Sequence, residues 1–122
     1  MKTGIMFINL GTPAGPDVRS VRRYLAEFLM DPFVVDLPWF FRALLVYGII
    51  LPTRPKRSAA AYQAIWQPAG SPLRLYSEAL LAQMQTEPAL SECVLTLSMR
   101  YGEPACKAAV QEIMQENCER VV

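Results

Sequence analysis

The sequence predicts an α/β domain with a doubly wound parallel sheet. Ile5–Ile8 is an unbroken apolar run, which is typical of a strand buried on both faces of a parallel sheet. Cys93–Met99 predicts a second strand, reached after several segments of helical pattern, and Glu119–Val122 has the pattern of the first residues of a third strand. Strands that alternate with helices favour parallel pairing through crossover connections.

Composition limits the function classes. The 122 residues are enough for one domain with a core of its own. The net charge of +1 gives no indication of a nucleic-acid partner. Histidine is absent, which excludes an imidazole base or metal ligand within these residues. Cys93, Cys106 and Cys118 are odd in number and lack C-x-x-C spacing, which favours reduced thiols in a cytoplasmic protein over a disulfide framework or a metal site.

The end of the first strand is the first candidate ligand position. Asn9, Gly11 and Pro13 interrupt the apolar run and predict a loop over Leu10–Pro13. In open α/β sheets, ligands bind outside the carboxyl ends of the strands. We therefore expect Leu10 to lie near a ligand.

A helix is expected over Asp17–Met30, with Pro16 and Asp17 at its start and Asp31–Pro32 after its end. The apolar residues follow helical spacing and the opposite face is basic. This basic face is either simply solvated or forms an anion site, and its arginines are Arg19, Arg22 and Arg23.

The segment Val34–Pro52 is strongly apolar around a single charge, Arg42. Its longest uncharged run is far shorter than the ~20 residues that a membrane-spanning helix needs. Two interpretations remain, namely a helix buried all round, or an apolar lip that contacts a membrane surface or an apolar ligand. Pro38 and Gly48, together with the proline at its end, predict a short helix with irregular flanks.

A basic loop is expected at Thr53–Arg57, followed by Ser58 as the N-cap of a helix over Ala59–Trp66. Ser71 and Pro72 have the residue types of an N-cap and a first helical position, and that helix ends before Pro88. Ser71 is either a helix cap alone, or part of a helix start that also receives a polar or anionic ligand group.

The second strand ends in Arg100, Tyr101 and Gly102, and a helix over Pro104–Asn117 follows it, with Ala109, Val110, Ile113 and Met114 inward. The guanidinium group of Arg100 suits a carboxylate or a phosphate, or it pairs with a neighbouring acid. Neither G-x-G-x-x-G nor a Walker loop is present, which weakens a nucleotide-binding interpretation. Because the chain stops as a third strand begins, we expect it to be a fragment of a longer protein.

Seven blocks, in order and in register along Met1–Val122, resemble the start of the bacterial ferrochelatases: Asn9–Pro13, Val21–Pro32, Val34–Pro38, Arg54–Ser58, Tyr62–Trp66, Gly70–Leu73 and Met99–Gly102. This family inserts ferrous iron into protoporphyrin IX to make haem, with coproporphyrin as the alternative substrate, in a cleft between two similar α/β lobes. The resemblance implies that residues 1–122 are the N-terminal chelatase lobe, truncated at the start of its third strand.

The resemblance also implies roles for single residues. Leu10 matches the position that touches the porphyrin face, and five further residues match positions that line the cleft or meet the propionates. The segment Trp39–Leu51 matches the family's apolar lip and implies peripheral membrane contact by a cytoplasmic protein. The five implied cleft residues are Arg54, Tyr62, Ser71, Arg100 and Tyr101.

The family's metal-handling histidine and glutamate belong to the second lobe. The resemblance therefore implies no catalytic or metal-ligating residue here and no cofactor, because ferrous iron is a substrate of the full-length enzyme. We expect the fragment alone to be inactive. Two alternatives remain, namely a nucleotide- or phosphate-binding module of the same fold class and a membrane-surface interaction module.

Overall fold

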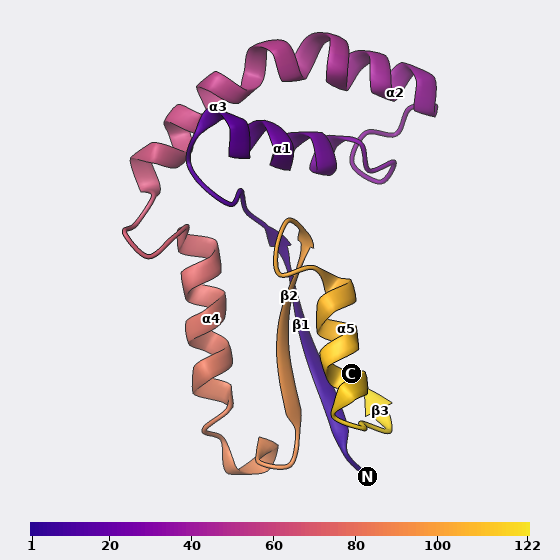
Figure 1. Cartoon of the computed structure of the whole chain (residues 1–122), viewed down its shortest axis with the longest axis vertical. Helices are drawn as coiled ribbons and strands as arrows, with labels where there is room; N and C mark the ends of the chain where they lie inside the picture. The colour runs from indigo at the N-terminus through magenta and orange to yellow at the C-terminus, as the bar shows by residue number, and fades with distance from the viewer. The chain divides into compact units, whose positions relative to one another are not determined.

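The computed structural model describes all residues 1–122 and divides into two compact units. The sheet unit comprises Met1–Thr12 and Leu73–Val122, and the helical unit comprises Pro13–Pro72. The sheet unit contains a three-stranded parallel sheet with helices beside it, which confirms the predicted α/β class (Figure 1).

The sheet has the order β2-β1-β3, with β1 (Thr3–Gly11) in the middle. Its two partners, β2 (Val94–Tyr101) and β3 (Arg120–Val121), both run parallel to it. All three strands were predicted. The loop predicted over Leu10–Pro13 begins later than expected, because β1 continues to Gly11, which is paired with Tyr101.

The expectation that β1 is buried on both faces is also wrong within this chain. Ile8 is 56% exposed, and Ile5 is only half-buried. The physical reason is incomplete cover, since β3 pairs only with Thr3 and Gly4 and the backbone hydrogen bonds on that side end with the one from Met6 N to Val122 O. The carboxyl half of β1 therefore has a strand neighbour on the β2 side alone.

Helix α5 (Cys106–Gln115) packs on the sheet through Ala109 and Ile113, which are buried as predicted. The close approach is possible because Gly4 has no side chain, and a Cβ there would lie only 2.5 Å from Ile113 Cγ2. Val110 and Met114 were predicted to point inward, but they are exposed. Two residues one turn apart suffice to cover a sheet this narrow, so the neighbouring positions face solvent.

Helix α4 (Pro72–Met84) and the short 3₁₀ turn η2 (Pro88–Leu90) connect to β2. None of the residues of α4 is buried, although the helix is rich in apolar side chains. Tyr76 and Leu80, for example, are 70% and 53% exposed.

The helical unit begins with α1 (Val18–Leu29), which starts where the sequence predicts. Asp17 is its N-cap, and its carboxylate accepts a hydrogen bond of 3.0 Å from the backbone N–H of Ser20. Val21 and Tyr24 are its buried residues. They lie on a helix that packs against α3 (Leu51–Ile65), as Figure 1 shows.

A continuous helical run precedes and includes α3, and it consists of α2 (Trp39–Leu45), the π-helical turn η1 (Val46–Ile50) and α3 itself. The predicted short helix, the loop at Thr53–Arg57 and the N-cap at Ser58 are therefore wrong.

The prolines explain both the error and the π turn. Pro52 follows the π turn directly and Pro55 lies inside α3, so both prolines stand within the continuous helical run. In η1 the N–H of Leu51 donates to Val46 O, five residues back, and the Thr53 hydroxyl donates to Ile49 O at 2.7 Å. The helix thus widens by one residue just before Pro52, and the Thr53 hydroxyl adds a side-chain hydrogen bond to the same turn.

Gly11→Ala should destabilise the sheet unit. Gly11 has φ +117°, and a Cβ there would collide with the carbonyl oxygen of Tyr101. We expect a loss of about 2 kcal/mol or more in the free energy of unfolding, measured by urea denaturation. Gly48→Ala is the control, because a Cβ at Gly48 meets only Leu44 Cδ1 at 3.8 Å in a helical turn. It should stabilise by roughly 0.5–1 kcal/mol, and equal effects at both positions would contradict the argument.

Candidate functional site

The six predicted site residues fall into two groups, one in each unit. Leu10, Arg100 and Tyr101 belong to the sheet unit. Arg54, Tyr62 and Ser71 belong to the helical unit. The structure brings the three residues of the sheet unit together. The roles of all six residues as porphyrin contacts stay predictions.

The sheet-edge group lies at the carboxyl ends of β1 and β2. The pairing of Gly11 with Tyr101 places Leu10 next to the end of β2. Leu10 is 51% exposed, whereas Tyr101 is buried. The guanidinium carbon of Arg100 lies 5.0 Å from the centroid of the Tyr101 ring, within the range of a cation–π contact. The edge therefore combines an accessible aliphatic side chain with a cation held over an aromatic ring.

Asn9 fixes the backbone at this edge. Its side-chain oxygen accepts a hydrogen bond of 2.8 Å from Leu10 N, and its amide nitrogen donates to Ser77 Oγ at 3.1 Å. Ser77 in turn donates to Leu73 O at 2.7 Å on α4. The sequence interpretation treated Asn9 only as the end of an apolar run. A polar side chain directly after such a run was the available signal, whereas nothing in the sequence marked Ser77.

Thr12 is a second residue that the sequence interpretation missed. It is 7% exposed, and its hydroxyl oxygen is buried without a hydrogen-bond partner. Gly102 approaches it closely, because a Cβ on Gly102 would lie 3.0 Å from Thr12 O. A buried hydroxyl without a partner carries a desolvation cost that a polar ligand group can relieve.

In the helical unit, Arg54 is exposed on α3 and forms no ion pair. Tyr62 lies about two turns further along the same helix, and its ring meets Trp66 edge-on with centroids 6.4 Å apart. Burial raises the pKa of the Tyr62 phenol above its ordinary value. Ser71 is 2% exposed and directly precedes α4.

The lip segment, Trp39–Leu51, presents large apolar side chains to solvent. Trp39 and Phe40 are 68% and 66% exposed. Arg42, by contrast, is buried and donates from Nη1 to Leu37 O at 2.8 Å. The segment's one charge is thus turned inward, and the alternative of a helix buried all round is wrong for this chain. No helix in the structure has the length and apolar character to cross a bilayer.

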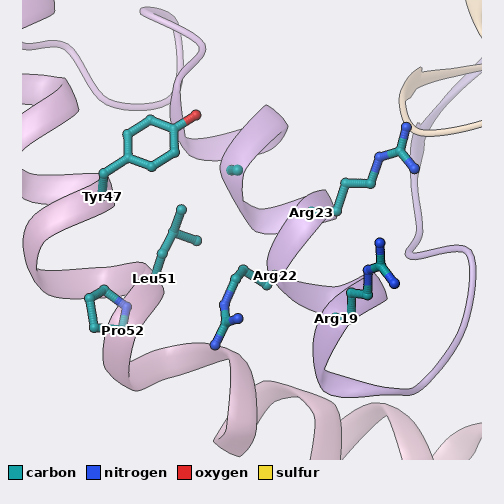
Figure 2. A pocket seen from close by; sticks show the side chains of 7 residues that line it. Arg19, Arg22, Arg23, Tyr47, Leu51 and Pro52 are labelled. Carbon is teal, nitrogen blue, oxygen red and sulfur yellow. The ribbon is translucent and has the colours of Figure 1, made fainter.

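A groove lies between α1 and the η1–α3 run, and we call it the α1 groove (Figure 2). Its volume is about 670 Å³. The basic face of α1 forms one wall of this groove. The sequence alone allows two interpretations of this face, namely a solvated surface or an anion site. The lining residues are Arg19, Arg22, Arg23, Ala26, Tyr47, Leu51 and Pro52.

Metal-ligating side chains do not gather anywhere in the chain, since no three His, Cys, Asp or Glu side chains form a group that could hold an ion. The three cysteines are unpaired and partly buried. The site chemistry available here is therefore apolar contact, hydrogen bonding and cationic binding of an anionic group.

Known proteins match this chain over nearly its whole length. The sequence model of the ferrochelatase family matches residues 2–122. The chain is 46% identical over 121 residues to a ferrochelatase of Coxiella burnetii, covering 99% of this chain and 34% of that protein. It is 43% identical over its full 122 residues to a coproporphyrin III ferrochelatase of Lactiplantibacillus plantarum, of which it covers 37%. A ferrochelatase of Stutzerimonas stutzeri is 46% identical over 117 residues, which are 96% of this chain and 33% of that protein. The chain thus spans about a third of the length of the curated relatives it matches.

The raised pKa of Tyr62 predicts a pH dependence of stability. Between the unfolded pKa near 10 and the higher folded pKa, the unfolded chain releases the phenol proton while the folded chain keeps it. The stability that this group contributes is present below the unfolded pKa and is lost as pH rises through the folded pKa. We expect the urea midpoint of the unsubstituted chain to fall more steeply than that of Tyr62→Phe from pH 9 to 11.5. Parallel curves would contradict the burial argument, and the exposed Tyr76→Phe serves as the control.

Proposed function

The chain belongs to the ferrochelatase family, and we propose that it is the porphyrin-contacting N-terminal lobe of an enzyme that inserts ferrous iron into protoporphyrin IX to make haem. The observation that carries the proposal is the joint position of Leu10, Arg100 and Tyr101 at the carboxyl edge of the sheet. The family match does not favour the alternative of a nucleotide- or phosphate-binding module.

The chemistry of these residues fits a porphyrin. A porphyrin is a flat apolar disc with carboxylates at one edge, so it needs aliphatic or aromatic walls and a few cations. Leu10 offers an exposed aliphatic surface for the face of the ring. Arg54 has no acidic partner to displace, and Arg100 is already oriented by the ring of Tyr101. Each guanidinium group can bind a propionate through two parallel hydrogen bonds.

Iron insertion requires removal of the pyrrole protons and strain on the ring, in addition to binding. Leu10 and the cleft residues supply contacts that orient the macrocycle and resist its planar form. No histidine is available among these residues to take the pyrrole protons. We therefore propose that the base and the iron-handling groups come from the rest of the protein, and that ferrous iron enters as a substrate.

We further propose that the protein is cytoplasmic and that the lip segment contacts the membrane surface. Six large hydrophobic side chains on this segment are more than half exposed, and its only charge is buried. A porphyrin is itself apolar over most of its surface and partitions into lipid, so contact with a membrane would bring the protein to its substrate. The six side chains are Trp39, Phe40, Phe41, Leu44, Tyr47 and Ile49.

Propionate recognition is tested by comparing protoporphyrin IX with its dimethyl ester. We expect Arg54→Gln and Arg100→Gln each to weaken protoporphyrin binding about tenfold, because each substitution removes a charge-assisted hydrogen bond. Binding of the ester, which lacks the carboxylates, should change by less than about twofold. Titration of the Soret absorbance in mild detergent measures both dissociation constants.

Arg120→Gln is the matched control, since Arg120 is exposed on β3 and pairs with Thr3 at the amino end of β1, opposite the end that carries Leu10. It should bind both porphyrins as the unsubstituted chain does. Equal weakening of acid and ester in the arginine variants would reject carboxylate recognition. Absence of porphyrin binding by the unsubstituted chain would reject the proposed site.

Membrane contact is tested by vesicle flotation. Phe40→Ser with Leu44→Ser removes two exposed apolar side chains from the lip, and we expect vesicle binding to fall by at least tenfold because buried apolar area drives interfacial binding. Tyr76→Ser with Leu80→Ser is the control, because these side chains are similarly exposed on α4. If the α4 pair abolished binding and the lip pair did not, the lip would not be the contact surface.

A further inference from the structure

The two units carry opposite net charges. The helical unit has seven Arg or Lys residues against four Asp or Glu residues, a net charge of +3, whereas the sheet unit has five against seven, a net charge of −2. The exposed aromatic side chains of the lip segment also belong to the positive unit. An apolar surface on a cationic unit is the combination that binds anionic bilayers.

The α1 groove concentrates this combination. Arg19, Arg22 and Arg23 form no ion pair or hydrogen bond through their guanidinium groups within the helical unit. Asp17 is the acid that acts electrostatically on Arg19, and its carboxylate is engaged in capping α1 through Ser20. In Figure 2 the Arg22 side chain runs along the groove toward the Pro52 side, while Arg19 and Arg23 extend from α1 away from Tyr47.

The opposite wall is apolar, because Tyr47, Leu51 and Pro52 line it, with Ala26 on the α1 side. Tyr47 belongs both to this wall and to the exposed face of the lip, where it is 58% exposed. Leu44 precedes it by one helical turn. The groove and the lip are therefore continuous along one side of the helical run. Tyrosine, with an apolar ring and a polar tip, suits such a boundary between lipid and water.

We propose that the α1 groove binds one anionic phospholipid, with the phosphate on Arg22 and the first part of the acyl chains along Tyr47 and Leu51. Arg19 and Arg23 add attraction for the anionic surface without touching that phosphate. A free phosphate ion would gain nothing from the apolar wall, which is why the occupant is a lipid. The inference rests on the membrane contact proposed for the lip and specifies the head group that this contact selects.

The test uses the whole chain and a soluble short-chain lipid, dihexanoyl-phosphatidylglycerol, below its micellar concentration. We expect saturable binding of one lipid per chain by calorimetry. Arg22→Gln should weaken it about tenfold by removing the charged donor. Ala26→Phe should weaken it to a similar degree by filling the groove while leaving the net charge unchanged.

Arg57→Gln is the matched control, because it removes one exposed charge from the same unit outside the groove, and it should alter binding by less than about twofold. Circular dichroism verifies that each variant folds. Because Arg22→Gln and Ala26→Phe act by different means, loss of folding in one leaves the other as the test.

Three results would overturn the inference: equal affinity for dihexanoyl-phosphatidylcholine, equal affinity for inorganic phosphate alone, or unchanged lipid binding in both groove variants. The proposed porphyrin-binding function is tested by a different measurement, so its failure can be distinguished from failure of lipid binding in the groove. Porphyrin binding should be unaffected by Arg22→Gln and Ala26→Phe, and the lip variant with Phe40→Ser and Leu44→Ser should lose vesicle binding but keep the soluble lipid.

Discussion

The parallel pairing of β1 with β2 is the constraint on which the sheet unit depends. It brings residues about ninety positions apart into register and ends with Gly11 opposite Tyr101. Only a residue without a side chain fits there, because the Tyr101 carbonyl occupies the space of a Cβ. The same close approach sets Leu10, Arg100 and Tyr101 at one edge. The geometry of the candidate site is therefore a direct consequence of backbone packing.

The helical unit follows a different constraint, namely the accommodation of proline in a long helix. The π turn η1 shifts the hydrogen-bond register just before Pro52, so the helix continues through a segment rich in breaking residues. That continuity keeps the lip and Arg54 on one rigid element. Within the lip, Arg42 donates back to Leu37 O, which leaves the exposed face of the lip without a charge.

Much of the fold could be predicted from the sequence, because apolar runs separated by helical patterns are strong local signals. All three strands, α1 with its Asp17 cap, and α5 lie where the pattern indicates. The helix through Pro52 and Pro55 could not be predicted, since proline is normally a stop signal and the sequence gives no sign of the π turn before Pro52.

Burial was the least predictable property. Ile8, Val110 and Met114 have apolar side chains in the expected periodicity, yet they are exposed because their cover depends on elements that a local pattern does not describe. For the site, the strand-end position of Arg100 and Tyr101 was a local signal. The roles of Asn9, Ser77 and Thr12 were not, because each arises from a contact or a buried environment created by the folded chain.

Helix α4 is held in the fold by few tertiary interactions. It contributes no buried residue, so its local opening exposes little apolar surface and requires little free energy. The Asn9–Ser77 hydrogen bond nevertheless ties it to the end of β1, and the same Asn9 side chain holds the amide of Leu10. Each opening of α4 that breaks this bond removes one restraint from the Asn9 side chain, which also accepts from Leu10 N. The residue proposed to face the substrate ring is thereby coupled to the fluctuations of the least anchored helix in the chain.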